Sequence, residues 1–118
     1  MPAVLGAFIA ALAVILGAFG AHTLKPVLSG SELETYHTAV YYLLMHGIAM
    51  VLTRFSPSLT KAGWLFLTGI ILFSGSLFLI VLTGIRLFGI ITPFGGVLFI
   101  LGWITFGVQL YREYRNAS

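Results

Sequence analysis

Four long apolar stretches, separated by short polar segments, account for nearly the whole sequence. They cover about residues 3–24, 32–53, 61–82 and 92–111. Each is close to the ~20 residues that a helix needs to cross the hydrocarbon core of a bilayer. Because the connections are short, neighbouring helices must be antiparallel. The pattern therefore predicts an all-α integral membrane protein, with residues 1–118 forming one transmembrane domain of four antiparallel helices in one bundle.

Residues with known preferences for helix ends mark the borders of these stretches. Pro26 follows the first stretch, and Ser31 with Glu34 matches the capping-box pattern that opens a helix. Gly84 lies where a C-cap glycine is expected after the third stretch. Pro93 lies at the first helical position, where proline is favoured, and marks the start of the fourth stretch.

Composition supports the membrane assignment and excludes several classes of protein. Apolar residues make up 59% of the chain and charged residues 8%, whereas about a quarter of the residues of a soluble domain are charged. The few basic residues lie near predicted helix ends, so there is no basic stripe that would bind nucleic acid. The chain has no cysteine, which excludes disulfides, thiolate nucleophiles and cysteine-bound metal clusters.

The distribution of Lys and Arg predicts the orientation in the membrane. Four of these residues fall on the side that holds both termini and two on the other: Arg54, Lys61, Arg112 and Arg115 against Lys25 and Arg86. Cytoplasmic segments carry the excess of Lys and Arg. We therefore expect both termini to be cytoplasmic.

Small residues recur along the first stretch at spacings of four, three, four and three: Gly6, Ala10, Ala13, Gly17 and Gly20. This spacing places them along one side of a helix, where small side chains let two backbones approach closely. The alternative is that Gly and Ala are simply frequent in membrane helices. Because the repeat persists over the whole span, we interpret it as a packing seam.

The second stretch holds two histidines, His37 and His46, which are the ionisable side chains expected deepest in the bilayer. Nine residues separate them, so they lie on opposite faces of a helix and one of them should face the bundle. His46 lies about 5 Å from the midplane, at about the depth of Thr68 and Thr105, if each helix rises ~1.5 Å per residue. These residues predict an intramembrane polar layer, which could either fix the helix register through hydrogen bonds or carry a proton or solute. The structural interpretation is favoured, because ion and proton pathways use chains of ionisable groups and no carboxylate is expected in the membrane.

A second polar group is expected at the outer face, and it consists of His22, Glu32, Glu34 and His37. Histidine and carboxylate side chains are metal ligands, but no recognised ligand motif, such as two histidines four residues apart, is present. We expect these side chains to cap helices and pair with Lys25. The sequence thus predicts no metal site, no catalytic residue and no cofactor.

Four strings of sequence, in this order and spacing, carry a resemblance to a known family. They are GAFGAHTL (17–24), YHTAVYYLLMHGIAM (36–50), GWLFLTGIILFSGSLFLIVLTG (63–84) and ITPFGGVLFILGW (91–103). The chain resembles the YgdD/YwdK-type family of small, uncharacterised four-helix membrane proteins. That resemblance implies a bacterial inner (cell) membrane location, or the mitochondrial inner membrane for a eukaryotic source. It implies no activity, ligand or catalytic residue.

The combined pattern favours a non-enzymatic structural or interaction protein, either a homo-oligomer or a small accessory subunit of a larger membrane complex. The small-residue seams, the small polar mass outside the membrane and the absence of catalytic pairs support it. The alternative is a channel or transporter for protons or a small solute. That function would need a hydrated cavity reaching His46.

Overall fold

The structure, a computed structural model, describes residues 1–117. This part of the chain folds into four long helices joined by short connections. The long helices are α1 (Pro2–Phe19), α2 (Gly30–Leu52), α3 (Thr60–Thr83) and α4 (Thr92–Ala117); a π-helical turn, Gly20–Leu24, continues α1, and 3₁₀ turns occupy Thr53–Phe55, Pro57–Leu59 and Arg86–Ile90. All four are long and apolar enough to span a membrane. The predicted class, an all-α protein with four membrane helices, is confirmed.

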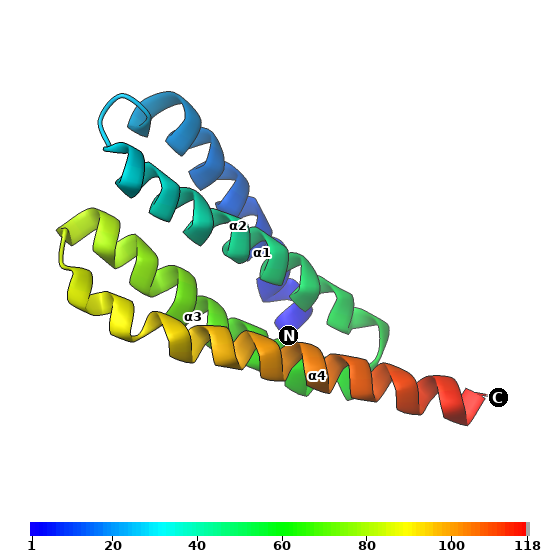
Figure 1. Cartoon of the computed structure of the whole chain (residues 1–118). Helices are drawn as coiled ribbons and strands as arrows, with labels where there is room; N and C mark the ends of the chain where they lie inside the picture. The colour runs from blue at the N-terminus through cyan, green and yellow to red at the C-terminus, as the bar shows by residue number, and fades with distance from the viewer. Residues whose placement is uncertain (118) are drawn as a thin grey trace.

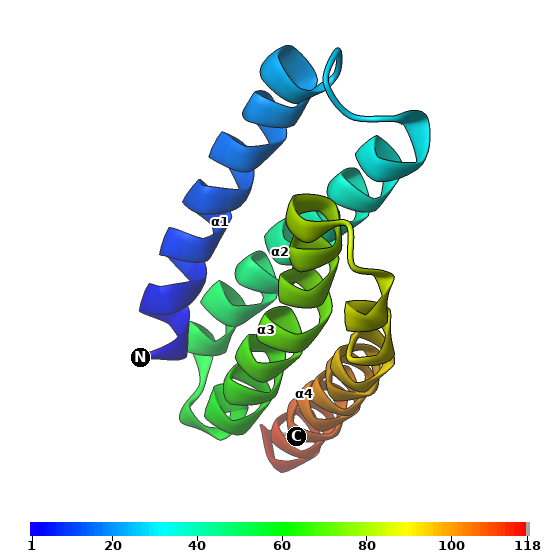
Figure 2. The ribbon, with the colours of Figure 1, turned by 90° about the vertical axis from the view of Figure 1, so that its left-hand side faces the viewer.

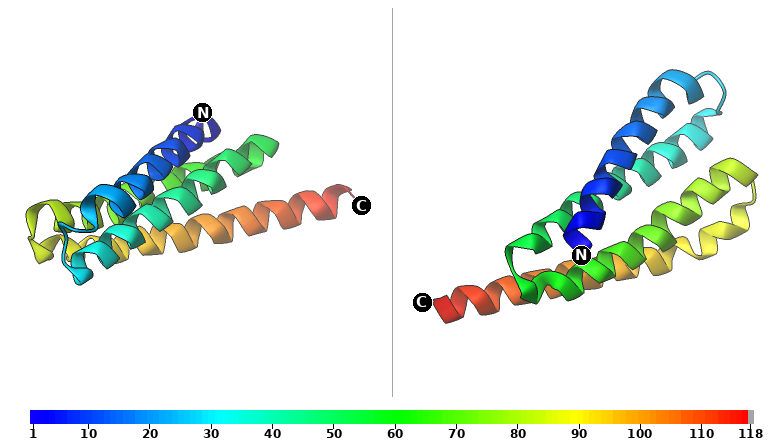
Figure 3. Two further views of the ribbon diagram at one scale, coloured as in Figure 1. Left: turned by 90° about the horizontal axis from the view of Figure 1, so that it is seen from above. Right: turned by 180° about the vertical axis from the view of Figure 1, so that it is seen from behind.

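Consecutive helices pack side by side, so the chain forms two hairpins joined through α2 and α3. Helix α1 packs on α2, α2 on α3, and α3 on α4 (Figure 1). Figure 2 shows α1 and α4 on opposite flanks of the bundle. Both termini lie at the same end, and the two hairpins diverge toward the other end (Figure 3). The arrangement leaves part of α2 uncovered between its two flanking helices.

Local capping interactions determine where α2 begins and α3 ends. Ser29 accepts a hydrogen bond from the backbone N–H of Glu32, and the Glu32 carboxylate accepts one from the backbone N–H of Ser29, each at 3.1 Å. The capping box therefore exists, but two residues before the predicted pair of Ser31 and Glu34. Gly84 ends α3 with a φ of 73°, a left-handed conformation that glycine adopts without strain.

The seam of small residues on α1 faces α2. A Cβ atom on Gly6 would lie 2.5 Å from the carbonyl oxygen of Gly47 and 2.6 Å from Cβ of Met50, so the two backbones are in direct contact there. Contact is looser at Gly17, where a Cβ would lie 3.6 Å from a methyl group of Val40. The predicted seam is present, and its surface is used within the chain rather than left for another subunit.

Helix α4 is longer than the predicted 92–111 and continues to Ala117. Glu113, on the added turns, accepts hydrogen bonds from the hydroxyls of Ser56 and Ser58, the latter at 2.5 Å. These bonds connect the end of α4 to the turn between α2 and α3. The apolar pattern alone does not reveal this extension, because polar residues beyond the membrane carry no hydrophobic signal.

The outer surfaces of α1 and α4 are strongly apolar, as the hydrocarbon of a bilayer requires. Phe8 is 70% exposed on α1, and Phe94 is 64% exposed on α4. The interior is built around Phe66 and Met50, both completely buried. Large apolar side chains thus cover the outside of the bundle as well as its inside, which distinguishes a membrane domain from a soluble one.

Candidate functional site

His46 lies in the interior of the bundle with only 2% of its surface exposed. Its Nδ1 is 3.0 Å from the backbone carbonyl oxygen of Tyr42, and its Nε2 is 3.1 Å from Nε1 of Trp103. A carbonyl oxygen can only accept a hydrogen bond, and an indole N–H can only donate one. The two contacts therefore define one neutral tautomer, with the proton on Nδ1 and the lone pair of Nε2 facing Trp103.

The imidazole is enclosed by aromatic rings from three helices. It stacks on Phe99 of α4 with 3.6 Å between ring centroids and an interplanar angle of 10°. Phe66 of α3 lies 5.4 Å away, and Tyr42 of α2 is stacked at 5.9 Å. A Cβ atom on Gly69 would lie 2.5 Å from the Phe99 ring. Glycine at this position therefore leaves space for the Phe99 ring. This aromatic cluster holds α2, α3 and α4 in a single register.

The geometry limits the chemistry available to His46. Both ring nitrogens already have partners within the protein, and the aromatic rings exclude water from the ring faces. Binding a metal or adding a second proton would require Nε2 to lose its bond with Trp103. The arrangement suits a hydrogen-bonded spacer between helices better than a proton carrier.

The predicted polar layer does not assemble around His46. Thr68 is exposed, and its hydroxyl donates to the carbonyl oxygen of Trp64 on its own helix, at 3.0 Å. Thr105 is half-buried on α4. Equal depth along a helix axis does not imply the same direction around it, and here Thr68 points away from the bundle. The partner of His46 is Trp103 instead.

Trp103 had no predicted role, although a general rule points to it. An indole N–H inside a membrane needs an acceptor, and a neutral imidazole supplies one. Two serines on α3 also make interhelical bonds: Ser74 donates to the Ala39 carbonyl oxygen on α2 at 2.8 Å, and Ser76 lies 2.5 Å from the hydroxyl of Thr92. The polar groups of α3 therefore contact both neighbouring helices.

The four predicted outer-face residues are all exposed but are not brought together as one group. Glu32 is occupied by the capping box at the start of α2, whereas Glu34 and His37 line a different surface. Within residues 1–117, no three His or acidic side chains lie close enough to hold a metal ion. The outer-face cluster therefore separates into a helix cap, a pair on α2, and His22 in the π-helical turn.

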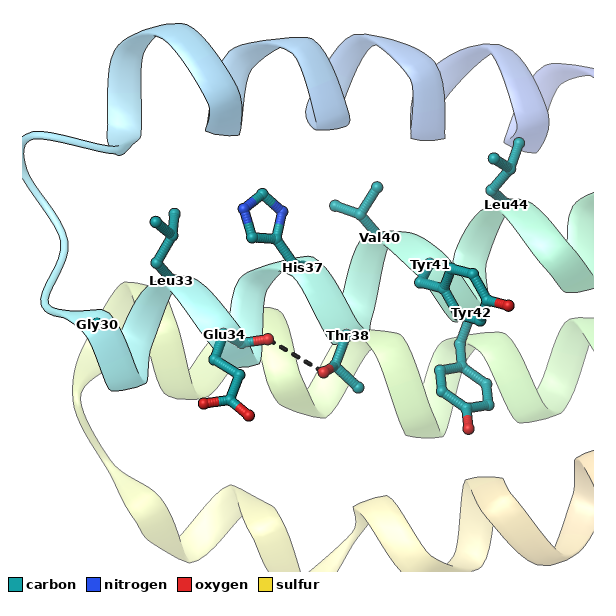
Figure 4. A pocket seen from close by; sticks show the side chains of 9 residues that line it. All are labelled: Gly30, Leu33, Glu34, His37, Thr38, Val40, Tyr41, Tyr42 and Leu44. Carbon is teal, nitrogen blue, oxygen red and sulfur yellow. Dashed lines mark hydrogen bonds between the residues drawn. The ribbon is translucent and has the colours of Figure 1, made fainter.

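The pair on α2 belongs to an open groove of about 720 Å³, which we call the α2 groove. It is lined by Gly30, Leu33, Glu34, His37, Thr38, Val40, Tyr41, Tyr42 and Leu44. Figure 4 shows α2 in front, with Leu33, His37 and Val40 pointing toward α1. Glu34, Thr38 and Tyr42 point to the opposite side, toward α4. Tyr41 lies between these two rows and is 61% exposed.

Comparison with known proteins gives the family but no activity. Residues 16–96 match the family model described as protein of unknown function (DUF423). The UPF0382 membrane protein YwdK of Bacillus subtilis is 45% identical over 86% of this chain and 88% of its own length. A UPF0382 membrane protein of Staphylococcus aureus is 44% identical over 92% of this chain and 93% of its own. No solved structure matches. The predicted family is confirmed: this chain belongs to the DUF423 (UPF0382) family of membrane proteins.

Proposed function

We propose that this chain is a non-enzymatic structural or interaction protein of the bacterial inner (cell) membrane. It works as a homo-oligomer or as a small accessory subunit of a larger membrane complex. The observation that carries the proposal is the α2 groove, a largely apolar surface that carries Glu34, His37 and Tyr41 and that the chain's own helices leave open. The relatives, which are membrane proteins of two bacteria, support a location in a bacterial membrane.

The polar residues of the groove extend to a depth where lipid is a poor neighbour. Counted from Gly30, His37 lies roughly 10 Å and Tyr41 roughly 16 Å along the α2 axis, at ~1.5 Å per residue. Polar side chains are costly in hydrocarbon unless they have partners. Helix α2 is also the least apolar of the four spans, which suits a helix that is covered by protein on more than one side.

The small-residue seams give less support than the sequence indicated. The seam on α1 packs on α2 within the chain, and Gly95 on α4 is in contact with the α3 backbone, where a Cβ would lie 2.4 Å from N of Phe73. A close approach of backbones is thus already used to build one subunit. The case for an interaction protein depends on the α2 groove.

The alternative of a proton or small-solute channel needs water to reach His46. The geometry does not favour this, because the ring is 2% exposed and both of its nitrogens are hydrogen-bonded to protein atoms. The enclosing aromatic rings would also have to move apart. We therefore retain the interaction protein as the proposed function.

Measuring the mass of the particle extracted from native membranes tests the proposal. A polymer that excises protein with its surrounding lipid preserves weak contacts, and mass measurement then counts the chains. We expect particles that hold more than one 12.8 kDa chain, or this chain together with another protein. A uniform population of single chains at native expression level would contradict the proposed function.

A further inference from the structure

We propose that the α2 groove is the contact between two copies of this chain, related by a two-fold axis along the membrane normal. This rests on the proposed function and names the partner as a second copy. Copies inserted in the same orientation can form a closed symmetric pair only about such an axis. The exposed surface of α2 must then be complementary to itself.

The two rows of the groove provide that complementarity. His37 lies on the side of Tyr41 that faces α1, and Glu34 lies on the side that faces α4 (Figure 4). A two-fold rotation exchanges left and right, so the row of one copy that holds His37 faces the row of the other that holds Glu34. Tyr41 then lies next to the axis, opposite its own copy.

The distances along the helix allow the side chains to meet. Glu34 and His37 differ by three residues, which is ~4.5 Å along the axis at ~1.5 Å per residue. The reach of the two side chains covers such an offset. The imidazole of each copy can therefore donate to the carboxylate of the other, and the symmetric interface would contain this pair twice. Both side chains are exposed in the single chain, so neither must leave an existing partner in the core.

A second copy suits this surface better than lipid does. Acyl chains offer no hydrogen-bond partner to the hydroxyl of Tyr41, which lies deeper in the bilayer than Glu34 and His37. A tyrosine 61% exposed near the middle of α2 likewise gains a protein neighbour at the axis. The opposite rows favour one register of the two helices, because sliding one copy by a turn would place Glu34 opposite apolar side chains.

Cross-linking of single cysteines tests the proposal directly, since the natural chain has no cysteine. Tyr41→Cys is placed in the groove, and the matched control is Ile71→Cys, which is also 61% exposed and lies near the middle of α3. In native membranes, a short thiol cross-linker should produce dimers of Tyr41→Cys and few of Ile71→Cys. Equal yields from both variants would overturn the proposal.

A charge exchange separates a specific pair from mere proximity. In the Tyr41→Cys background, Glu34→Gln removes a charge from both symmetric pairs and should weaken association roughly tenfold. The double variant E34H/H37E exchanges the two groups between rows and should restore the yield. A yield unaffected by Glu34→Gln, or a double variant that gives no more dimer than Glu34→Gln, would refute the pairing. Cross-linking of Tyr41→Cys only to a different membrane protein would refute the second copy but leave the proposed function standing.

Discussion

Replacing Trp103 with phenylalanine removes the hydrogen-bond donor of His46. The indole Nε1 of Trp103 lies 3.1 Å from Nε2 of the imidazole, and among residues 1–117 it is the one hydrogen-bond donor to this lone pair. Phenylalanine keeps a ring but has no N–H. The lone pair of a residue that is 2% exposed is then left without a partner inside the bundle.

The size of the effect follows from two losses, that of the hydrogen bond to His46 and that of part of the ring packing. An interhelical hydrogen bond in a membrane protein contributes about 0.6–2 kcal/mol. The smaller ring loses some packing as well, but Trp103 is 41% exposed, so only the inner part of its ring contributes. We expect the free energy of unfolding to fall by about 1–3 kcal/mol in total.

The chain contains a matched control for this change. Trp64 is the other of the two tryptophans and is 42% exposed, almost the same fraction as Trp103. The backbone carbonyl oxygen of Trp64 accepts a hydrogen bond from the Thr68 hydroxyl, and this bond survives a change of the Trp64 side chain. Trp64→Phe removes the same atoms without removing the donor to His46. The difference between the two variants therefore isolates the contact of indole and imidazole.

Two measurements read the result. Unfolding in mixed micelles with increasing dodecyl sulfate gives the difference in the free energy of unfolding. Nitrogen-15 NMR of the histidine rings shows directly whether the proton of His46 is on Nδ1, as the contact with the Tyr42 carbonyl requires. Equal destabilisation by Trp64→Phe and Trp103→Phe, or a proton found on Nε2 in the natural chain, would refute this account of the site.

Three further predictions concern packing, hydrogen bonding and topology. Gly6→Ala should lower the free energy of unfolding by about 1–3 kcal/mol, measured by heat or detergent, because the added Cβ would lie 2.5 Å from the backbone of α2. Gly75→Ala, which has nothing within 4 Å of its added Cβ, should leave stability nearly unchanged. Similar losses from both variants would exclude the close contact of α1 and α2. Ser74→Ala should lower stability by about 0.6–2 kcal/mol through the lost bond to α2, and an unchanged unfolding curve would show that bond to be unimportant. Cysteines at Val27 and Phe55, both highly exposed in loops, should react with impermeant reagent from opposite sides, with Val27 outside; labelling of Phe55 in intact cells would reverse the orientation.

The number of helices and their approximate ends could be predicted from the sequence because these features depend on local interactions. A run of apolar residues long enough to span the bilayer must satisfy its own backbone hydrogen bonds, and a helix is the way a single segment does so. Gly84 marked the end of α3 correctly for the same reason, since its left-handed φ of 73° belongs to the residue itself. The capping box was misplaced by two residues because both serines match the motif and only the backbone geometry distinguishes them.

The direction in which each side chain points was decided by the tertiary structure. Counting residues along the helices predicts similar depths for His46 and Thr68, yet one is buried among rings and the other is exposed. The reason is that rotation about a helix axis depends on which neighbours pack against it. Trp103 meets His46 although 57 residues separate them. The partner of the small-residue seam was likewise undetermined, since a second chain or the next helix satisfies the same spacing. Depth in the membrane follows from counting residues along one helix, whereas contacts between helices depend on crossing angles and rotations that only the packing of all four determines.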